Sequence, residues 1–252
     1  MQSIVEILAQ ELGQKQQYVE NVVNLIDEGN TIPFIARYRK EMHGAMDDTT
    51  LRNLETRLTY LRNLQQRRDE VKKSIENQGK LTRELSEAID AAATMTEVED
   101  LYRPYKQKRR TRGSIAREKG LDLLAQAIFA QDGQDIQKLA KDFINEEKGV
   151  ATAEEAIASA LDIIAENLSD DADIRKALRE LCSRRGSLVS KAADPEADTV
   201  YKLYYDFNQP ISRLLDHQIL AINRGEKEDI LKVTVTLPGN EGPALVCRAA
   251  LK

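Results

Sequence analysis

The sequence of 252 residues has little of the chemistry that marks several protein classes. It contains two cysteines, two histidines and no tryptophan, too few for a disulfide scaffold or a Cys/His zinc site. It has no run of 18 apolar residues and no signal-peptide pattern at the N-terminus, so it predicts neither a membrane span nor secretion. A reducing cytoplasm is the compartment that this composition favours.

Motifs of common enzymes are also missing. The sequence lacks a G-x-S-x-G elbow, a Walker loop, a G-x-G-x-x-G loop, H-E-x-x-H and C-x-x-C. Carboxylates are plentiful, but the pair Asp170 and Asp171 precedes a helical pattern and is better explained as capping. We expect His217 to be a structural hydrogen-bonding residue. The sequence therefore predicts a protein that is not an enzyme and has no cofactor or metal.

What the sequence does contain is a strong asymmetry of charge. The formal net charge is −5, which on its own argues against a nucleic-acid binder. Residues 103–119, however, hold eight basic side chains and a single acidic one, Glu118, so this segment carries +7 and the rest of the chain −12. Phosphates within about 8–10 Å respond to such a local field whatever the total charge is.

Apolar residues at three- and four-residue spacing predict helices through most of the first 182 residues. One helix should begin after Ser3 and end at Gly13, and a long central helix should run from a cap at Asp47, Asp48 or Thr49 to about Gln78. Further helices are expected near residues 19–28, 32–40, 82–93, 121–129, 136–144, 171–182 and 211–224. Two more should open with capping boxes, which are formed by Thr96 with Glu99 and by Thr152 with Glu155.

Only residues 230–237 alternate between apolar and polar as a strand does, and residues 244–248 are the expected partner. Because an isolated hairpin is marginal in water, this unfinished sheet predicts that the natural chain continues. The predicted fold is mainly α, multihelical with a long central helix, plus a small C-terminal β segment. We place a helical domain at residues 1–195 and the start of a mixed α/β segment, expected to be truncated, at residues 196–252.

Residues 31–41, with the sequence TIPFIARYRKE, form the first candidate motif. We expect a short helix that buries Phe34, Ile35 and Tyr38 against the long helix. Its basic side chains could contact phosphate or could pair with Glu41 and nearby acids, and the sequence leaves both interpretations open. These side chains are Arg37, Arg39 and Lys40.

Residues 101–112 form the second candidate motif, which should be mostly loop because Pro104 ends the preceding helix. One interpretation is a cationic loop that grips a phosphate backbone, with Tyr102 or Tyr105 stacking on a base. The other is a solvated loop neutralised by neighbouring acidic faces. The candidate binding residues are Arg103, Lys106, Lys108, Arg109, Arg110 and Arg112.

Together with residues 220–226, these two motifs resemble the Tex family of bacterial transcription accessory proteins. The resemblance runs in order from about residue 3 to 237. It implies a cytoplasmic nucleic-acid-binding protein tied to transcription, with a helix-turn-helix-like element in this region. It also implies a longer chain, in which an RNase H-like domain, helix-hairpin-helix motifs and a C-terminal OB-fold RNA-binding domain follow.

Two functions remain as alternatives. The first is a non-catalytic nucleic-acid-binding transcription accessory fragment, whose basic loop contacts the backbone of RNA or DNA weakly. The second is a protein-interaction scaffold that docks other domains of the longer chain or the transcription machinery, for example RNA polymerase. We expect a monomer with no membrane partner.

Overall fold

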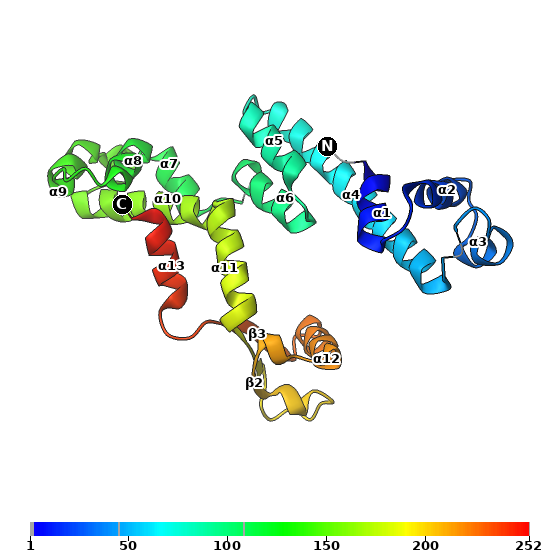
Figure 1. Cartoon of the computed structure of the whole chain (residues 1–252). Helices are drawn as coiled ribbons and strands as arrows, with labels where there is room; N and C mark the ends of the chain where they lie inside the picture. Colours follow the sequence, from blue (N-terminus) through cyan, green and yellow to red (C-terminus); the bar gives the residue numbers. More distant parts are fainter. Residues whose placement is uncertain (1–2, 45, 108, 252) are drawn as a thin grey trace. The chain divides into compact units, whose positions relative to one another are not determined.

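The computed structural model describes residues 3–44, 46–107 and 109–251. As predicted, the fold is mainly α: the described residues form thirteen α-helices and one small sheet of three strands (Figure 1). They make two compact units, Met1–Tyr102 and Arg103–Lys252, and each is described here by itself. Among the described residues, no helix combines the length and the apolar character needed to cross a membrane.

The first unit contains six helices whose ends follow the predicted signals. They are α1 (Ile4–Leu12), α2 (Gln16–Asp27), α3 (Ile32–Tyr38), α4 (Asp48–Glu76), α5 (Arg83–Ala91) and α6 (Met95–Tyr102). Ser3 accepts a hydrogen bond from the backbone of Glu6 at the start of α1, and Asp47 caps α4 in the same way. Gly13 ends α1 with a φ of 63°, which glycine adopts without strain.

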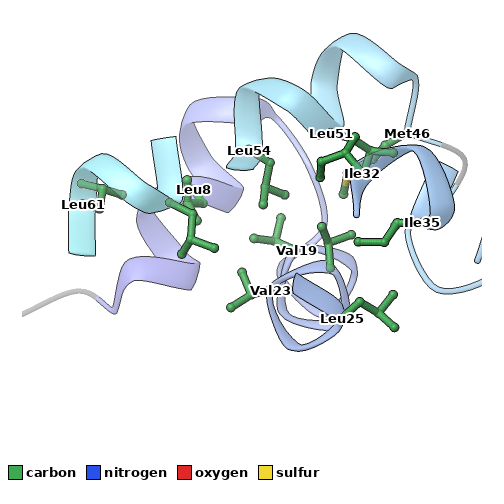
Figure 2. Packing of buried hydrophobic residues seen from close by; sticks show 12 residues of the cluster. Leu8, Val19, Val23, Leu25, Ile32, Ile35, Met46, Leu51, Leu54 and Leu61 are labelled. Atoms are coloured by element: carbon green, nitrogen blue, oxygen red, sulfur yellow. The ribbon is translucent and has the colours of Figure 1, made fainter. Parts of the chain in front are cut away.

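Helices α1, α2 and α3 cover the first half of α4 and bury one apolar cluster (Figure 2). Leu8 of α1 and Val19 of α2 meet Leu51 and Leu54 of α4 in this cluster. Helix α3 contributes Ile32 and Ile35, which are both buried. These two side chains fix how α3 lies on the unit.

The second half of α4 is joined to α5 and α6 by polar contacts as well as by buried apolar residues. Arg67 donates from Nε to Glu99 Oε1 at 2.6 Å, and Arg68 donates from Nη2 to the carbonyl of Ala92 at 2.7 Å. Arg67 and Arg68 lie between Leu64 and Val71, where the three- and four-residue spacing of buried apolar residues in α4 is interrupted. The interruption therefore marks the place where α6 and its preceding loop attach.

The capping box of α6 lies two residues earlier than predicted. Thr94 Oγ1 accepts from the backbone of Glu97 at 3.2 Å, and Glu97 Oε2 accepts from the backbone of Thr94 at 3.2 Å. The predicted pair of Thr96 and Glu99 is wrong, because α6 already begins at Met95 and Glu99 is bound to Arg67.

The second unit begins with a helical bundle. Its helices are α7 (Arg112–Glu118), α8 (Asp122–Ala130), α9 (Ile136–Ala140), α10 (Ala153–Asp170) and α11 (Ala172–Arg185). The first three pack on α10, whose small residues Ala156 and Ala160 are fully buried and let the helices approach closely. The helix predicted for residues 136–144 is shorter than expected, since a 3-10 turn, Lys141–Phe143, replaces its second half.

A three-stranded antiparallel sheet follows α11. Strand β1 (Ser187–Ala192) lies between β2 (Asp206–Pro210) and β3 (Leu231–Thr236). The predicted strand at residues 230–237 is thus confirmed as β3, which pairs with β1 over its whole length. Helix α12 (Asp216–Lys227) packs against β3 (Figure 1) and begins five residues later than predicted.

The predicted partner strand at residues 244–248 is wrong. These residues lie in α13 (Glu241–Ala250), which packs on α11. A short apolar run fits a buried helix as well as a strand, and here helix packing decides. Strands β1 and β2 complete the sheet that the sequence left unfinished. The sheet therefore gives no indication that the chain continues.

The first compact unit ends at residue 102 and the second begins at residue 103, whereas the sequence analysis placed a domain boundary after residue 195. A division at that position would separate β1 from β2 and β3, its two partner strands. Only Gly186 separates α11 from β1. Because no loop of distinct composition precedes β1, the sequence did not indicate this strand.

Candidate nucleic-acid interface

The basic loop, residues 103–112, is held at both ends by α10. At its first end, Arg103 Nε donates to Asp170 Oδ1 at 2.8 Å, and the Asp170 side chain is only 9% exposed. At its second end, Thr111 Oγ1 donates to Glu166 Oε2 at 2.9 Å. Glu166 and Asp170 lie one helical turn apart on α10. Hydrogen bonds to α10 therefore hold both ends of the segment between Arg103 and Thr111.

The second anchor also begins α7. Thr111 and Ser114 cap the helix reciprocally, at 2.9 and 3.0 Å. A Cβ atom at Gly113 would collide with Glu166 Oε2, so a larger residue there would displace the Glu166 carboxylate from Thr111. Arg117 adds a hydrogen bond to Glu166 at 3.3 Å. These contacts fix the direction in which the basic loop leaves the bundle.

The cations of the basic loop differ in whether a carboxylate of the chain binds them. Arg103 is committed to Asp170 and is a structural residue of the loop. Arg110 Nη2 lies 3.5 Å from Glu118 Oε2, but both side chains are well exposed, so this ion pair is weak.

Two arginines of the loop face solvent. Arg109 and Arg112 are exposed and have no carboxylate partner among the described residues. Lys106 is also exposed. Lys108, which the sequence includes among the candidates, lies outside the described residues. The structure thus leaves at least two guanidinium groups of the loop available to an external anion.

Most exposed arginines of α4 show the opposite situation. Arg52, Arg57 and Arg62 each have a carboxylate partner at 2.6–2.7 Å, in Asp48, Glu11 and Asp27. The hydrogen bonds from Arg57 and Arg62 lower the pKa values of the Glu11 and Asp27 carboxyl groups. The positive charge of α4 is therefore largely neutralised within the first unit.

Helix α3 and the two residues that follow it carry the other predicted cations, Arg37, Arg39 and Lys40. The aromatic residues of α3 differ from the prediction. Phe34 and Tyr38 are 36% and 57% exposed, so the expectation that they are buried is wrong. At 100° per residue Phe34 lies about 200° from Ile32, but Tyr38 lies only about 60° from the buried Ile35, so the helical periodicity alone does not predict that Tyr38 is exposed.

The basic side chains of α3 do not pair with Glu41. Among the described residues, Arg37, Arg39 and Lys40 have no carboxylate partner, and the two arginines lie beside aromatic rings instead. The sequence left two interpretations open for these cations, contact with phosphate or pairing with Glu41 and nearby acids. The described residues do not show the pairing. Because α3 and the basic loop belong to different units, each is a separate candidate.

Two further side chains have other roles than expected. Tyr102 is half-buried in the first unit, where its hydroxyl lies 3.0 Å from Ser74 Oγ and Arg67 lies over its ring, so it is not free to stack on a base. His217 is exposed and makes no side-chain hydrogen bond among the described residues. The buried histidine is His43, which the sequence did not single out.

Comparison with known protein families identifies the chain. The family model "Tex-like protein N-terminal domain" matches residues 2–76, and "Tex central region-like" matches residues 131–250. The chain belongs to the Tex family. Helix α3 lies inside the first Tex region, and the basic loop lies between the two.

Relatives of the Tex family match nearly the whole chain. "Protein tex" of Bordetella pertussis is 45% identical over 93% of this chain and 30% of its own length. "Transcriptional accessory protein Tex" of Neisseria gonorrhoeae is 38% identical over 96% of this chain and 32% of its own length. The human "S1 RNA-binding domain-containing protein 1" is 29% identical over 93% of this chain and 24% of its own length. The chain thus spans about a third or less of these relatives.

Proposed function

We propose that this chain is a non-catalytic nucleic-acid-binding part of a transcription accessory protein, and that its basic loop contacts the phosphate backbone. The observation that carries the proposal is the loop itself: α10 anchors both ends, while Arg109 and Arg112 between and beside the anchors lack carboxylate partners among the described residues. The names of the Neisseria and human relatives, which refer to transcription and to RNA binding, support it.

The chemistry of the loop favours backbone contacts over base readout. Guanidinium groups form paired hydrogen bonds to phosphate, and such contacts give affinity without sequence specificity. A partner held by a few exposed cations should bind weakly and be sensitive to salt. We therefore expect binding to RNA and to DNA, with no turnover of either.

The double variant Arg109→Ala/Arg112→Ala tests this proposal. Two exposed charge contacts are worth about 0.5–1 kcal/mol each, so affinity for an oligonucleotide should fall roughly 5- to 30-fold. Fluorescence anisotropy with labelled RNA and duplex DNA measures the change. The matched control is Arg52→Ala/Arg83→Ala, which removes the same charge from arginines that already pair with carboxylates. Equal affinities of the two variants would sink the proposal.

A second candidate function is the docking of other parts of the transcription machinery, for example RNA polymerase. The observation in its favour is a group of exposed apolar side chains around the sheet and α12. These are Val200, Leu203, Leu215, Leu220 and Val235. Slower amide hydrogen exchange in α12 when polymerase is added would support docking, and unchanged exchange would oppose it.

A further inference from the structure

Helix α3 presents two aromatic rings to solvent. The rings of Phe34 and Tyr38 are one turn apart, with centroids 5.2 Å from each other and planes tilted by 47°. Aromatic residues make up only 5% of the chain, and two of them are exposed here. The buried side chains of Ile32 and Ile35 attach α3 to the core, so the rings stand on a fixed support (Figure 2).

Cations surround these rings. The Cζ atom of Arg39 lies 5.4 Å from the centroid of Phe34, and that of Arg37 lies 5.9 Å from the centroid of Tyr38. Lys40 follows directly and is exposed. Three of the four basic residues in the first 50 positions are gathered here, and none has a carboxylate partner among the described residues. We call Phe34, Arg37, Tyr38, Arg39 and Lys40 the α3 platform.

We propose that the α3 platform is a stacking site for unpaired bases of a single-stranded nucleic acid. Aromatic rings and guanidinium planes both stack on bases, and neighbouring cations attract the phosphates that connect those bases. Bases within a duplex are already stacked on each other and cannot reach such rings, so single strands should be preferred. The inference rests on the proposed nucleic-acid partner, but it assigns a different contact on a different unit.

The absence of tryptophan from the sequence permits a direct test. In the variant Phe34→Trp the introduced indole is the sole tryptophan of the chain, and stacking of a base on it quenches its emission. We expect quenching by an oligouridylate and none by an abasic oligomer of the same length and charge. Phe129→Trp is the matched control, because Phe129 is 42% exposed on α8 and no cation lies over its ring among the residues that the structure describes. Its emission should respond to neither oligomer.

A second variant removes the rings and keeps the apolar volume. Phe34→Leu/Tyr38→Leu should weaken binding of a single strand at least about fivefold, the lower end expected for loss of one stacked base, and leave duplex binding unchanged. An equal loss for single strand and duplex, or unchanged emission of Phe34→Trp in a complex that anisotropy detects, would overturn the platform while the basic-loop proposal stands. Quenching by a protein partner but not by the oligomer would identify a protein-docking surface instead. Absence of any complex in anisotropy would reject both proposals.

Discussion

The arginines of this chain behave differently according to what lies within a few ångströms of each guanidinium. Arg57 reaches Glu11, 46 positions away in sequence, whereas Arg109 has no carboxylate partner among the described residues. Composition predicted where basic residues are dense, but a partner so distant in sequence cannot be read from spacing. For this reason the sequence could indicate the basic loop, yet it could not separate Arg103, which anchors the loop, from the cations that face solvent.

A prediction at the residue scale concerns His43. Its side chain is 1% exposed, and neither ring nitrogen has a hydrogen-bond partner among the described residues. Burial of an unsatisfied polar group costs free energy, so His43→Leu should be neutral or should raise the free energy of unfolding of the first unit by about 1–2 kcal/mol. Hydrogen exchange of amides in α2 and α4 measures this. Destabilisation by more than about 1 kcal/mol would show that the imidazole has polar partners.

At the scale of elements, local signals predicted best where a helix is long or well capped. The start of α1 and the whole of α4 follow from Ser3, Asp47 and the leucine spacing. Helix α13 was mistaken for a strand because a short apolar run suits either structure, and tertiary packing chooses between them. Strand β1 was missed because only Leu188, Val189 and Ala192 of its six residues are apolar. In α3 the helix itself was predicted correctly, and only the side that it buries was not.

The ion pairs between α4 and its neighbours lead to a prediction about acid stability. Arg57 and Arg62 lower the pKa values of Glu11 and Asp27 below their ordinary values of 4.5 and 3.8. The unfolded chain therefore binds more protons than the folded one in this range. The stabilisation is complete above the ordinary pKa values and is lost as the pH falls through the lowered ones.

The double variant Arg57→Met/Arg62→Met measures this contribution. Because both pairs are largely exposed, it should lower the free energy of unfolding by less than about 1 kcal/mol per pair at neutral pH. The difference from the unmodified chain should shrink in urea unfolding at about pH 3, which lies below the ordinary pKa values of both carboxyl groups. A difference of the same size at both pH values would contradict the assignment.

At the scale of the whole molecule, the net charge of −5 conceals how the charges are used. The ion pairs of α4 neutralise much of the first unit's positive charge, while uncompensated cations remain on α3 and in the basic loop. Membership of the Tex family agrees with the proposed role near nucleic acid. The two proposals assign different contacts to the two units: phosphate to the basic loop and bases to the α3 platform.

The salt dependence of binding tests the central claim most directly. Each phosphate contact contributes about 0.9 to the slope of log K against log salt for duplex DNA and about 0.7 for a single strand. Arg109→Ala/Arg112→Ala should therefore reduce the slope by about 1.8 on duplex DNA, whereas Arg52→Ala/Arg83→Ala should leave it unchanged. If the loop variant keeps the slope of the unmodified chain, the basic loop does not contact phosphate and the account is wrong.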